Sequence, residues 1–96
     1  MHLIQWDFLP AEDQLPEFLA TYGRDGDWVR LFRQGAGYLG TELQTMPGLP
    51  GWYRCLDRWQ REEDYAAFRS THAAEYRALD RACERLTRAE VPAWAE

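Results

Sequence analysis

The first residues of the chain alternate between apolar and polar side chains. Ile4, Trp6 and Phe8 stand at every second position, with polar residues between them. This period of two is typical of a strand that buries one of its faces. We therefore predict a strand over residues 2–9, which ends at Pro10.

The pattern then changes to steps of three and four residues, as in a helix with one apolar face. We predict a helix from an N-cap at Asp13 to Tyr22, with Leu15, Phe18 and Leu19 on its apolar face. Asp27 is a suitable N-cap for a second, short helix over residues 28–33.

Two further strands are predicted in the middle of the chain. The segments Tyr38–Thr45 and Trp52–Trp59 have the length of strands, and a turn rich in proline and glycine joins them. Because the two segments are neighbours in the sequence, we expect them to pair antiparallel.

The longest periodic stretch follows, and it predicts one helix over residues 62–88. Its first turn is acidic and its later half is rich in arginine, as the helix dipole favours. A short edge strand is expected over residues 91–96. The apolar stripe of the helix consists of Tyr65, Phe68, His72, Tyr76, Leu79, Cys83 and Leu86.

This order of elements is the split βαβ arrangement. We interpret residues 1–96 as one α+β domain with a ferredoxin-like βαββαβ fold and an antiparallel sheet. Its helices would cover one sheet face, and the other face would either bind a second copy of the chain or be solvated. We expect a homodimer, because this uncovered face combines leucines with charges of both signs: Leu3, Gln5, Leu9, Gly40, Glu42, Arg54, Leu56 and Arg58.

The composition narrows the range of partners. A net charge of −5 repels phosphate groups, so we expect neither nucleic acid nor a membrane surface as a partner. No apolar run approaches the ~20 residues that span a bilayer, and the first residues lack the features of a signal peptide.

Two cysteines form no disulfide framework, which favours a cytoplasmic location. The chain has no lysine, which excludes Schiff-base catalysis.

Three polar side chains are candidates for chemistry. His72, on the apolar stripe, is interpreted as a general base or as a packing histidine. Asp57 alternates with apolar residues and would face the helices and pair with His72, unless a shift of one residue in the register turns it outward. Tyr76 follows His72 by one helical turn, and its hydroxyl either binds a phenolic substrate or lies at the edge of the core.

Trp6, Trp28 and Trp59 would form the walls of an aromatic pocket or simply anchor the core. The glycines of Gly35–Gly40 match a dinucleotide-binding pattern, but they enter a strand where that motif must open a helix. No metal site is expected, because ligand spacing is absent among His2, His72, Cys55 and Cys83.

Several short motifs occur in a fixed order along the chain: Asp25–Phe32, Gly37–Leu43, Asp57–Trp59, Tyr65–Phe68 and then Tyr76. Together they resemble the antibiotic biosynthesis monooxygenase domain family. The resemblance implies a dimeric α/β barrel, in which two ferredoxin-like subunits pack sheet to sheet. It also implies a pocket between sheet and helices, where some members oxidise aromatic polyketide-like molecules without a metal or bound cofactor.

Members of this family that degrade haem use an asparagine, a tryptophan and a histidine. This chain has no asparagine, Phe68 stands at the position of the tryptophan, and Ala78 lies near that of the histidine. Haem degradation is therefore disfavoured, and Phe68 is counted among the expected substrate-binding residues.

The resemblance leads to the hypothesis of a cofactor-independent monooxygenase that acts on an aromatic or polyketide-like small molecule. His72, held by Asp57, would remove a proton from a phenol or enol, and the resulting carbanion would react with O₂. Tyr76 and Trp28 would position the ring. The alternatives are a non-catalytic ligand-binding or accessory dimer, and an isomerase or cyclase that uses the same base without oxygen.

Overall fold

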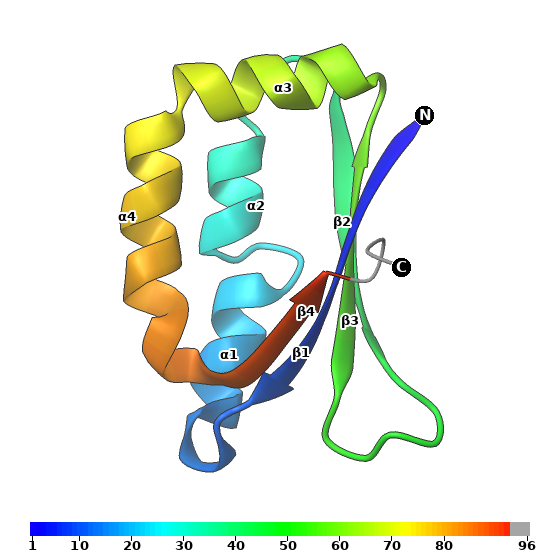
Figure 1. The fold of residues 1–96 in the computed structure, drawn as a ribbon, viewed down its shortest axis with the longest axis vertical. Helices are drawn as coiled ribbons and strands as arrows, with labels where there is room; N and C mark the ends of the chain where they lie inside the picture. Colours follow the sequence, from blue (N-terminus) through cyan, green and yellow to red (C-terminus); the bar gives the residue numbers. More distant parts are fainter. Residues whose placement is uncertain (93–96) are drawn as a thin grey trace.

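A four-stranded antiparallel sheet forms one layer of the computed structural model, which describes residues 1–92 (Figure 1). The spatial order of the strands is β2-β3-β1-β4, which is the order of a ferredoxin-like fold. The strands are β1 (His2–Pro10), β2 (Tyr38–Thr45), β3 (Tyr53–Trp59) and β4 (Thr87–Pro92).

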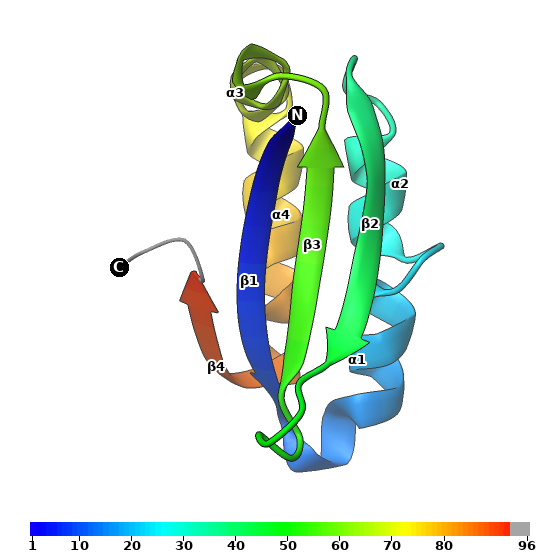
Figure 2. The same cartoon turned by 90° about the vertical axis from the view of Figure 1, so that its right-hand side faces the viewer.

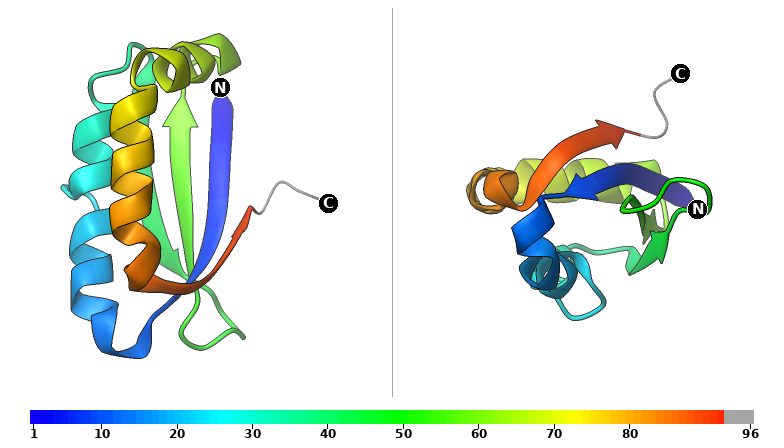
Figure 3. Two further views of the ribbon diagram at one scale, coloured as in Figure 1. Left: turned by 60° about the vertical axis from the view of Figure 1, so that its left-hand side comes forward. Right: turned by 90° about the horizontal axis from the view of Figure 1, so that it is seen from below.

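The helices form the second layer and lie on one face of the sheet, and the opposite face is uncovered (Figures 2 and 3). None of the helices in residues 1–92 is long and apolar enough to cross a membrane. They are η1 (Glu12–Gln14), α1 (Leu15–Tyr22), α2 (Asp27–Phe32), α3 (Glu62–Thr71), α4 (Ala73–Cys83) and the short η2 (Glu84–Leu86).

The three strands predicted over residues 2–9, 38–45 and 52–59 are confirmed, and so is the antiparallel pairing of β2 with β3. The register places Asp57 beside Thr41 on one side and beside Ile4 on the other. Residues in phase with Asp57 face the helices, because Ile4, Cys55 and Trp59 are all buried there. The predicted inward orientation of Asp57 is therefore correct.

The prediction of one long helix over residues 62–88 is wrong. The chain bends at His72, whose backbone angles (φ −110°, ψ 30°) are not helical, and α4 runs across the direction of α3 (Figure 1). The apolar stripe passes through the bend without interruption because both helices turn the same face towards the sheet. After α4 the helical pattern ends in η2, and the chain enters β4 at Thr87.

The predicted helix caps and edge strand also need correction. Asp13 lies inside η1, and Gln14 precedes α1. Gly26 is the N-cap of α2, and Asp27 is its first residue, where it forms an ion pair with Arg30 (2.9 Å). The edge strand begins at Thr87, earlier than predicted, and residues 93–96 of the predicted segment lie outside the described residues.

The core lies between the two layers and is rich in aromatic rings. Trp59 and Phe18 are fully buried, and Trp59 contacts the rings of Phe32 and Phe68 at centroid distances of 5.8 and 5.2 Å. On the uncovered face, Leu3 is 42% exposed and lies next to Arg58 across the strands. Ion pairs also lie on that face, joining Arg54 to Asp7 at 2.8 Å and Arg58 to Glu42 at 3.1 Å.

Candidate functional site

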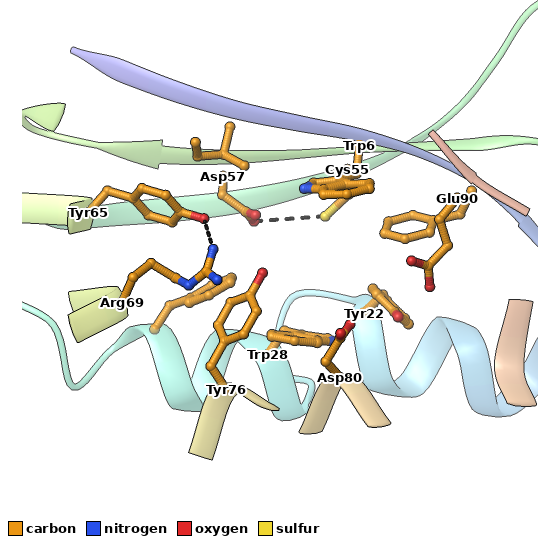
Figure 4. Close-up of a pocket in the computed structure, with 13 residues that line it drawn as sticks. Trp6, Tyr22, Trp28, Cys55, Asp57, Tyr65, Arg69, Tyr76, Asp80 and Glu90 are labelled. Atoms are coloured by element: carbon orange, nitrogen blue, oxygen red, sulfur yellow. Dashed lines mark hydrogen bonds between the residues drawn. The ribbon is translucent and has the colours of Figure 1, made fainter. Parts of the chain in front are cut away.

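A cavity of about 260 Å³ lies between the sheet and the helices (Figure 4). Strands β1, β3 and β4 contribute to its wall, and so does each of the four α-helices. Seven of its thirteen lining residues are aromatic, and four carry ionisable acidic or basic groups. The lining residues are Ile4, Trp6, Phe8, Tyr22, Trp28, Phe32, Cys55, Asp57, Tyr65, Arg69, Tyr76, Asp80 and Glu90.

Asp57 is the most deeply buried charged group on this wall, with 7% of its surface exposed. Its Oδ1 accepts a hydrogen bond from the Thr41 hydroxyl (2.7 Å) and a weak one from the Cys55 thiol (3.8 Å). Within residues 1–92, no hydrogen bond reaches its other oxygen, Oδ2. The carboxyl group is therefore anchored on one oxygen and has a second oxygen to offer to a ligand.

Burial raises the pKa of Asp57 to about 6, and the hydrogen bonds from Thr41 and Cys55 only partly oppose this shift. The cause is the cost of placing a carboxylate in an apolar environment. A carboxyl group with a pKa near neutrality can both take up and release a proton at physiological pH, as a general base must. Burial also raises the pKa of the neighbouring Cys55, so its thiol stays protonated.

One end of the cavity carries a positive charge between two phenols. Arg69 donates a hydrogen bond from Nη1 to the Tyr65 hydroxyl (2.9 Å), and its guanidinium lies 3.8 Å from the centre of the Tyr76 ring. Burial and the nearby Tyr65 raise the pKa of Tyr76, so its hydroxyl is neutral and available to donate. Figure 4 shows the Tyr76 hydroxyl pointing into the cavity, towards the side of Asp57. This end can bind and stabilise an anionic oxygen.

The other end of the cavity is acidic. Glu90 of β4 and Asp80 of α4 lie near the Tyr22 ring (Figure 4). Burial raises the pKa of Glu90, and so does the charge of Asp80. The two ends therefore differ in charge, which gives a bound molecule a preferred orientation.

The structure separates the two predicted catalytic residues. His72 is not among the lining residues, since it occupies the bend between α3 and α4 with its ring against Phe68 (5.2 Å). Its Nδ1 lies 3.0 Å from the Glu75 carboxylate. The hydrogen bonds of Asp57 go to other partners, so the predicted Asp57–His72 pair does not form.

The predicted substrate-binding residues divide into two groups. Trp6, Trp28 and Tyr76 line the cavity. Trp59 and Phe68 are buried in the core behind it, with 0% and 2% of their surface exposed. They support the wall without forming part of it.

Two residues of the site, Tyr65 and Arg69, were not predicted from the sequence. Their spacing held a signal, because Arg69 follows Tyr65 by four residues and precedes Tyr76 by seven, which puts all three on the apolar stripe of the sequence pattern. A charged residue on an apolar face is unusual and would have marked this end of the site. In residues 1–92, no three His, Cys, Asp or Glu side chains come together as a metal site requires.

Comparisons with known proteins bear on the fold. No protein-family model matches the chain, and no curated protein matches it. A solved structure described as a "putative antibiotic biosynthesis monooxygenase from Nitrosomonas europaea" superposes with a TM-score of 0.63 at 13% identity, over 95% of this chain and 94% of that one. The protein PA3566 from Pseudomonas aeruginosa superposes with a TM-score of 0.57 at 12% identity, over 93% and 85%.

The chain has the fold of these two proteins. The expected resemblance to the antibiotic biosynthesis monooxygenases is thereby confirmed at the level of fold. At 12–13% identity the likeness extends to the architecture alone. The chemistry has to be argued from the cavity itself.

Proposed function

We propose that the chain is a cofactor-independent monooxygenase that acts on an aromatic or polyketide-like small molecule in the cavity. The observation that carries the proposal is a buried carboxylate, Asp57, in a cavity with mostly aromatic walls. Such a cavity with a few convergent polar groups is the usual form of a small-molecule site. A carboxylate with a raised pKa in that position suits proton abstraction.

The reaction proposed starts at an acidic methylene group beside a phenolic ring. Asp57 removes one proton from it, and the electron pair left on carbon reduces O₂, with which the carbon combines to form a peroxide. The proton held by Asp57 passes to the peroxide. Loss of the second C–H proton and of water then leaves a carbonyl group, so CH₂ and O₂ become C=O and H₂O without any further reductant.

The remaining residues of the cavity would bind and orient this substrate. Arg69, with the hydroxyls of Tyr65 and Tyr76, would stabilise the phenolate or enolate oxygen on which charge develops. Trp6 and Trp28 would hold the aromatic rings by stacking. In this proposal Asp57 is the base, a role first predicted for His72, because His72 lies outside the cavity.

We also infer that two copies of the chain pack through their uncovered sheet faces. The face carries exposed apolar side chains beside charges of both signs, among them Leu3, Val91, Arg58 and Glu42. Self-complementary surfaces of this kind suit a two-fold interface. The two cysteines are free thiols, which agrees with a protein of the cytoplasm.

The test is O₂ uptake with dithranol, a dihydroxyanthrone whose methylene group is acidic, as the probe. We expect uptake above the rate in buffer, and a loss of at least about a hundredfold in Asp57→Asn, in line with the usual contribution of a general base. Asp13→Asn is the matched control, because its carboxylate is exposed and lies away from the cavity. Equal rates in the two variants would contradict the proposed role of Asp57.

Two other outcomes would replace the proposal. A product that forms equally well without O₂ would identify an isomerase or cyclase that uses the same carboxylate. A rise in melting temperature with the probe, without any turnover, would identify a binding module.

A further inference from the structure

A second hollow, of about 290 Å³, lies where the edge strand β2 meets α2. It shares no lining residue with the cavity that contains Asp57. Two arginines give it a positive character, in contrast to the aromatic cavity. Its lining residues are Arg24, Val29, Arg33, Tyr38, Leu39, Gly40 and Thr41.

Two hydroxyl groups join this hollow to Asp57. The Thr41 hydroxyl donates to Asp57 Oδ1 at 2.7 Å, and the Tyr38 hydroxyl lies 2.5 Å from Thr41 Oγ1. Both residues are half-buried and line the second hollow, while Asp57 lines the first cavity. The three side chains therefore form a continuous line of hydrogen bonds between two separate openings.

The direction of these hydrogen bonds follows from the chemistry of a hydroxyl group. Thr41 has a single hydroxyl hydrogen, and it is used in the bond to Asp57. Thr41 must therefore accept from Tyr38, whose own hydrogen points along the same line. Each hydrogen in the chain is directed towards the carboxylate, which is the arrangement needed to pass a proton inwards.

We propose that Tyr38 and Thr41 form a proton-conducting chain between the second hollow and Asp57. A proton arriving at the Tyr38 oxygen releases the hydrogen of Tyr38 to Thr41, and Thr41 releases its own hydrogen to Asp57 Oδ1. Asp57 becomes neutral, and each hydroxyl regains one hydrogen. The reverse sequence carries a proton out, with no change in either hydroxyl.

The chain gives Asp57 a route to solvent that does not pass through the ligand cavity. A molecule that fills the cavity and covers Oδ2 leaves Oδ1 connected through Thr41. Burial raises the pKa of Tyr38 above its ordinary value, so its hydroxyl keeps its hydrogen and serves as a neutral link in the line. The base could therefore exchange protons with solvent while the substrate remains bound.

The experiment measures how fast Asp57 takes up a proton, and it needs no substrate. A light-triggered acid jump across the pKa of Asp57, about 6, is followed in the infrared carboxyl band. The band is assigned as the part of the spectrum that Asp57→Asn removes. Tyr38→Phe deletes the outer hydroxyl while leaving the Thr41–Asp57 bond in place. Tyr53→Phe is the matched control, because Tyr53 is half-buried like Tyr38 and lines neither hollow.

We expect the rate constant to fall at least about tenfold in Tyr38→Phe, the factor that 1.4 kcal/mol of added barrier produces. Tyr53→Phe should keep the rate of the unmodified protein. Thr41→Val should slow the step in the same way, and Thr41→Ser, which restores a hydroxyl, should recover it. The equilibrium pKa, read from the same band, separates a slower transfer from a changed affinity for the proton.

A rate in Tyr38→Phe equal to that of the unmodified protein would overturn the proposal, because protons would then reach Asp57 through the ligand cavity. If Tyr38→Phe does not fold, as judged by circular dichroism, the comparison of Thr41→Val with Thr41→Ser decides in its place. Equal rates in those two variants would also overturn it. The outcome is independent of the proposed oxygenase reaction, because only the titration of Asp57 is observed.

Discussion

At the scale of a single residue, Asp57 lowers the stability of the fold and at the same time offers a carboxyl group for chemistry. It is buried, its wall neighbours are aromatic, and within residues 1–92 its Oδ2 receives no hydrogen bond. A group of this kind is expensive to keep in a folded core. Its presence on the wall of a cavity therefore points to chemistry.

The cost should appear as a dependence of stability on pH. The pKa of Asp57 is raised from 3.8 to about 6 in the folded protein. At a pH below both pKa values the carboxyl is protonated in the folded and in the unfolded state, so its burial does not lower the free energy of unfolding. As the pH rises through this window the unfolded state releases its proton first, and the free energy of unfolding falls by up to roughly 3 kcal/mol.

The measurement is urea unfolding at about pH 4 and about pH 8 for the unmodified protein and for Asp57→Asn. Asparagine keeps an acceptor for Thr41 and has no charge to bury. We expect Asp57→Asn to be the more stable of the two at the higher pH, and the difference to shrink at the lower pH. A difference that is constant across the window would show that the carboxylate carries no burial cost.

Arg69 should control the binding of an anionic oxygen. A charge-assisted hydrogen bond contributes about 1.5–3 kcal/mol, so Arg69→Gln should weaken binding about tenfold or more. The probe is a dihydroxyanthraquinone, which cannot be oxidised at a methylene group, and quenching of tryptophan fluorescence reports its binding. His72→Ala is the control, because His72 lies outside the cavity. A loss of affinity in His72→Ala as large as that in Arg69→Gln would contradict the assignment of the anion-binding end to Arg69.

The orientation of Asp57 could be predicted from the sequence, but its hydrogen-bond partner and the role of Arg69 could not. The inward orientation of Asp57 followed from strand alternation, which is rigid because its period is two. The partner of Asp57 did not follow, because Thr41 lies on a different strand and only the register of β2 against β3 brings it within reach. Arg69 was not predicted as a site residue, since the sequence does not show that its helix faces a hollow.

At the scale of elements, Gly37, which directly precedes β2, packs against the first turn of α3. Gly37 has φ +85°, and a Cβ there would collide with the carboxylate of Asp64. The backbone carbonyl of Gly37 also accepts a hydrogen bond from the Gln60 N–H (2.7 Å). Because α3 carries Tyr65 and Arg69, this contact helps to set the position of the charged end of the cavity.

Gly37→Ala should therefore destabilise the protein by two effects, backbone strain and a clash. Gly48→Ala is the matched control, since Gly48 has nearly the same angle (φ +82°) and a Cβ there meets nothing within 4 Å. Backbone strain alone costs on the order of 1 kcal/mol. We expect Gly37→Ala to lower the free energy of unfolding by about 1 kcal/mol or more beyond the loss in Gly48→Ala. Equal melting temperatures would show that Asp64 moves aside freely.

The bend at His72 shows where periodicity stops being informative. Tyr65, Phe68, His72, Tyr76 and Leu79 recur in steps of three and four, and this pattern predicted one helix. The steps are equally satisfied by two helices that both turn the same face to one core. Neither proline nor glycine stands at the bend, so the usual local signal of a helix end is missing.

At the scale of the whole molecule, the uncovered sheet face is the main surface that the fold leaves without a second layer (Figure 2). Leu3 and Val91 are 42% and 47% exposed on it. Ion pairs between neighbouring strands, Arg54 with Asp7 and Arg58 with Glu42, hold the charged side chains close to the sheet. A face of this kind, apolar in part and with its charges in ion pairs, can be buried against a copy of itself without leaving these charges unpaired.

The dimer should therefore be lost when one apolar contact on this face becomes charged. In Leu3→Glu, two copies of a carboxylate would have to be buried across the two-fold axis, which costs far more than the apolar contact contributes. Leu19→Glu is the matched control, because Leu19 is 39% exposed, nearly as much as Leu3, but lies on α1 in the helical layer. In sedimentation at micromolar concentration, the unmodified protein and Leu19→Glu should move as dimers and Leu3→Glu as a monomer. If all three sediment as monomers, the uncovered face is solvated and the cavity must work within a single subunit; if all three sediment as dimers, the two copies meet through another surface.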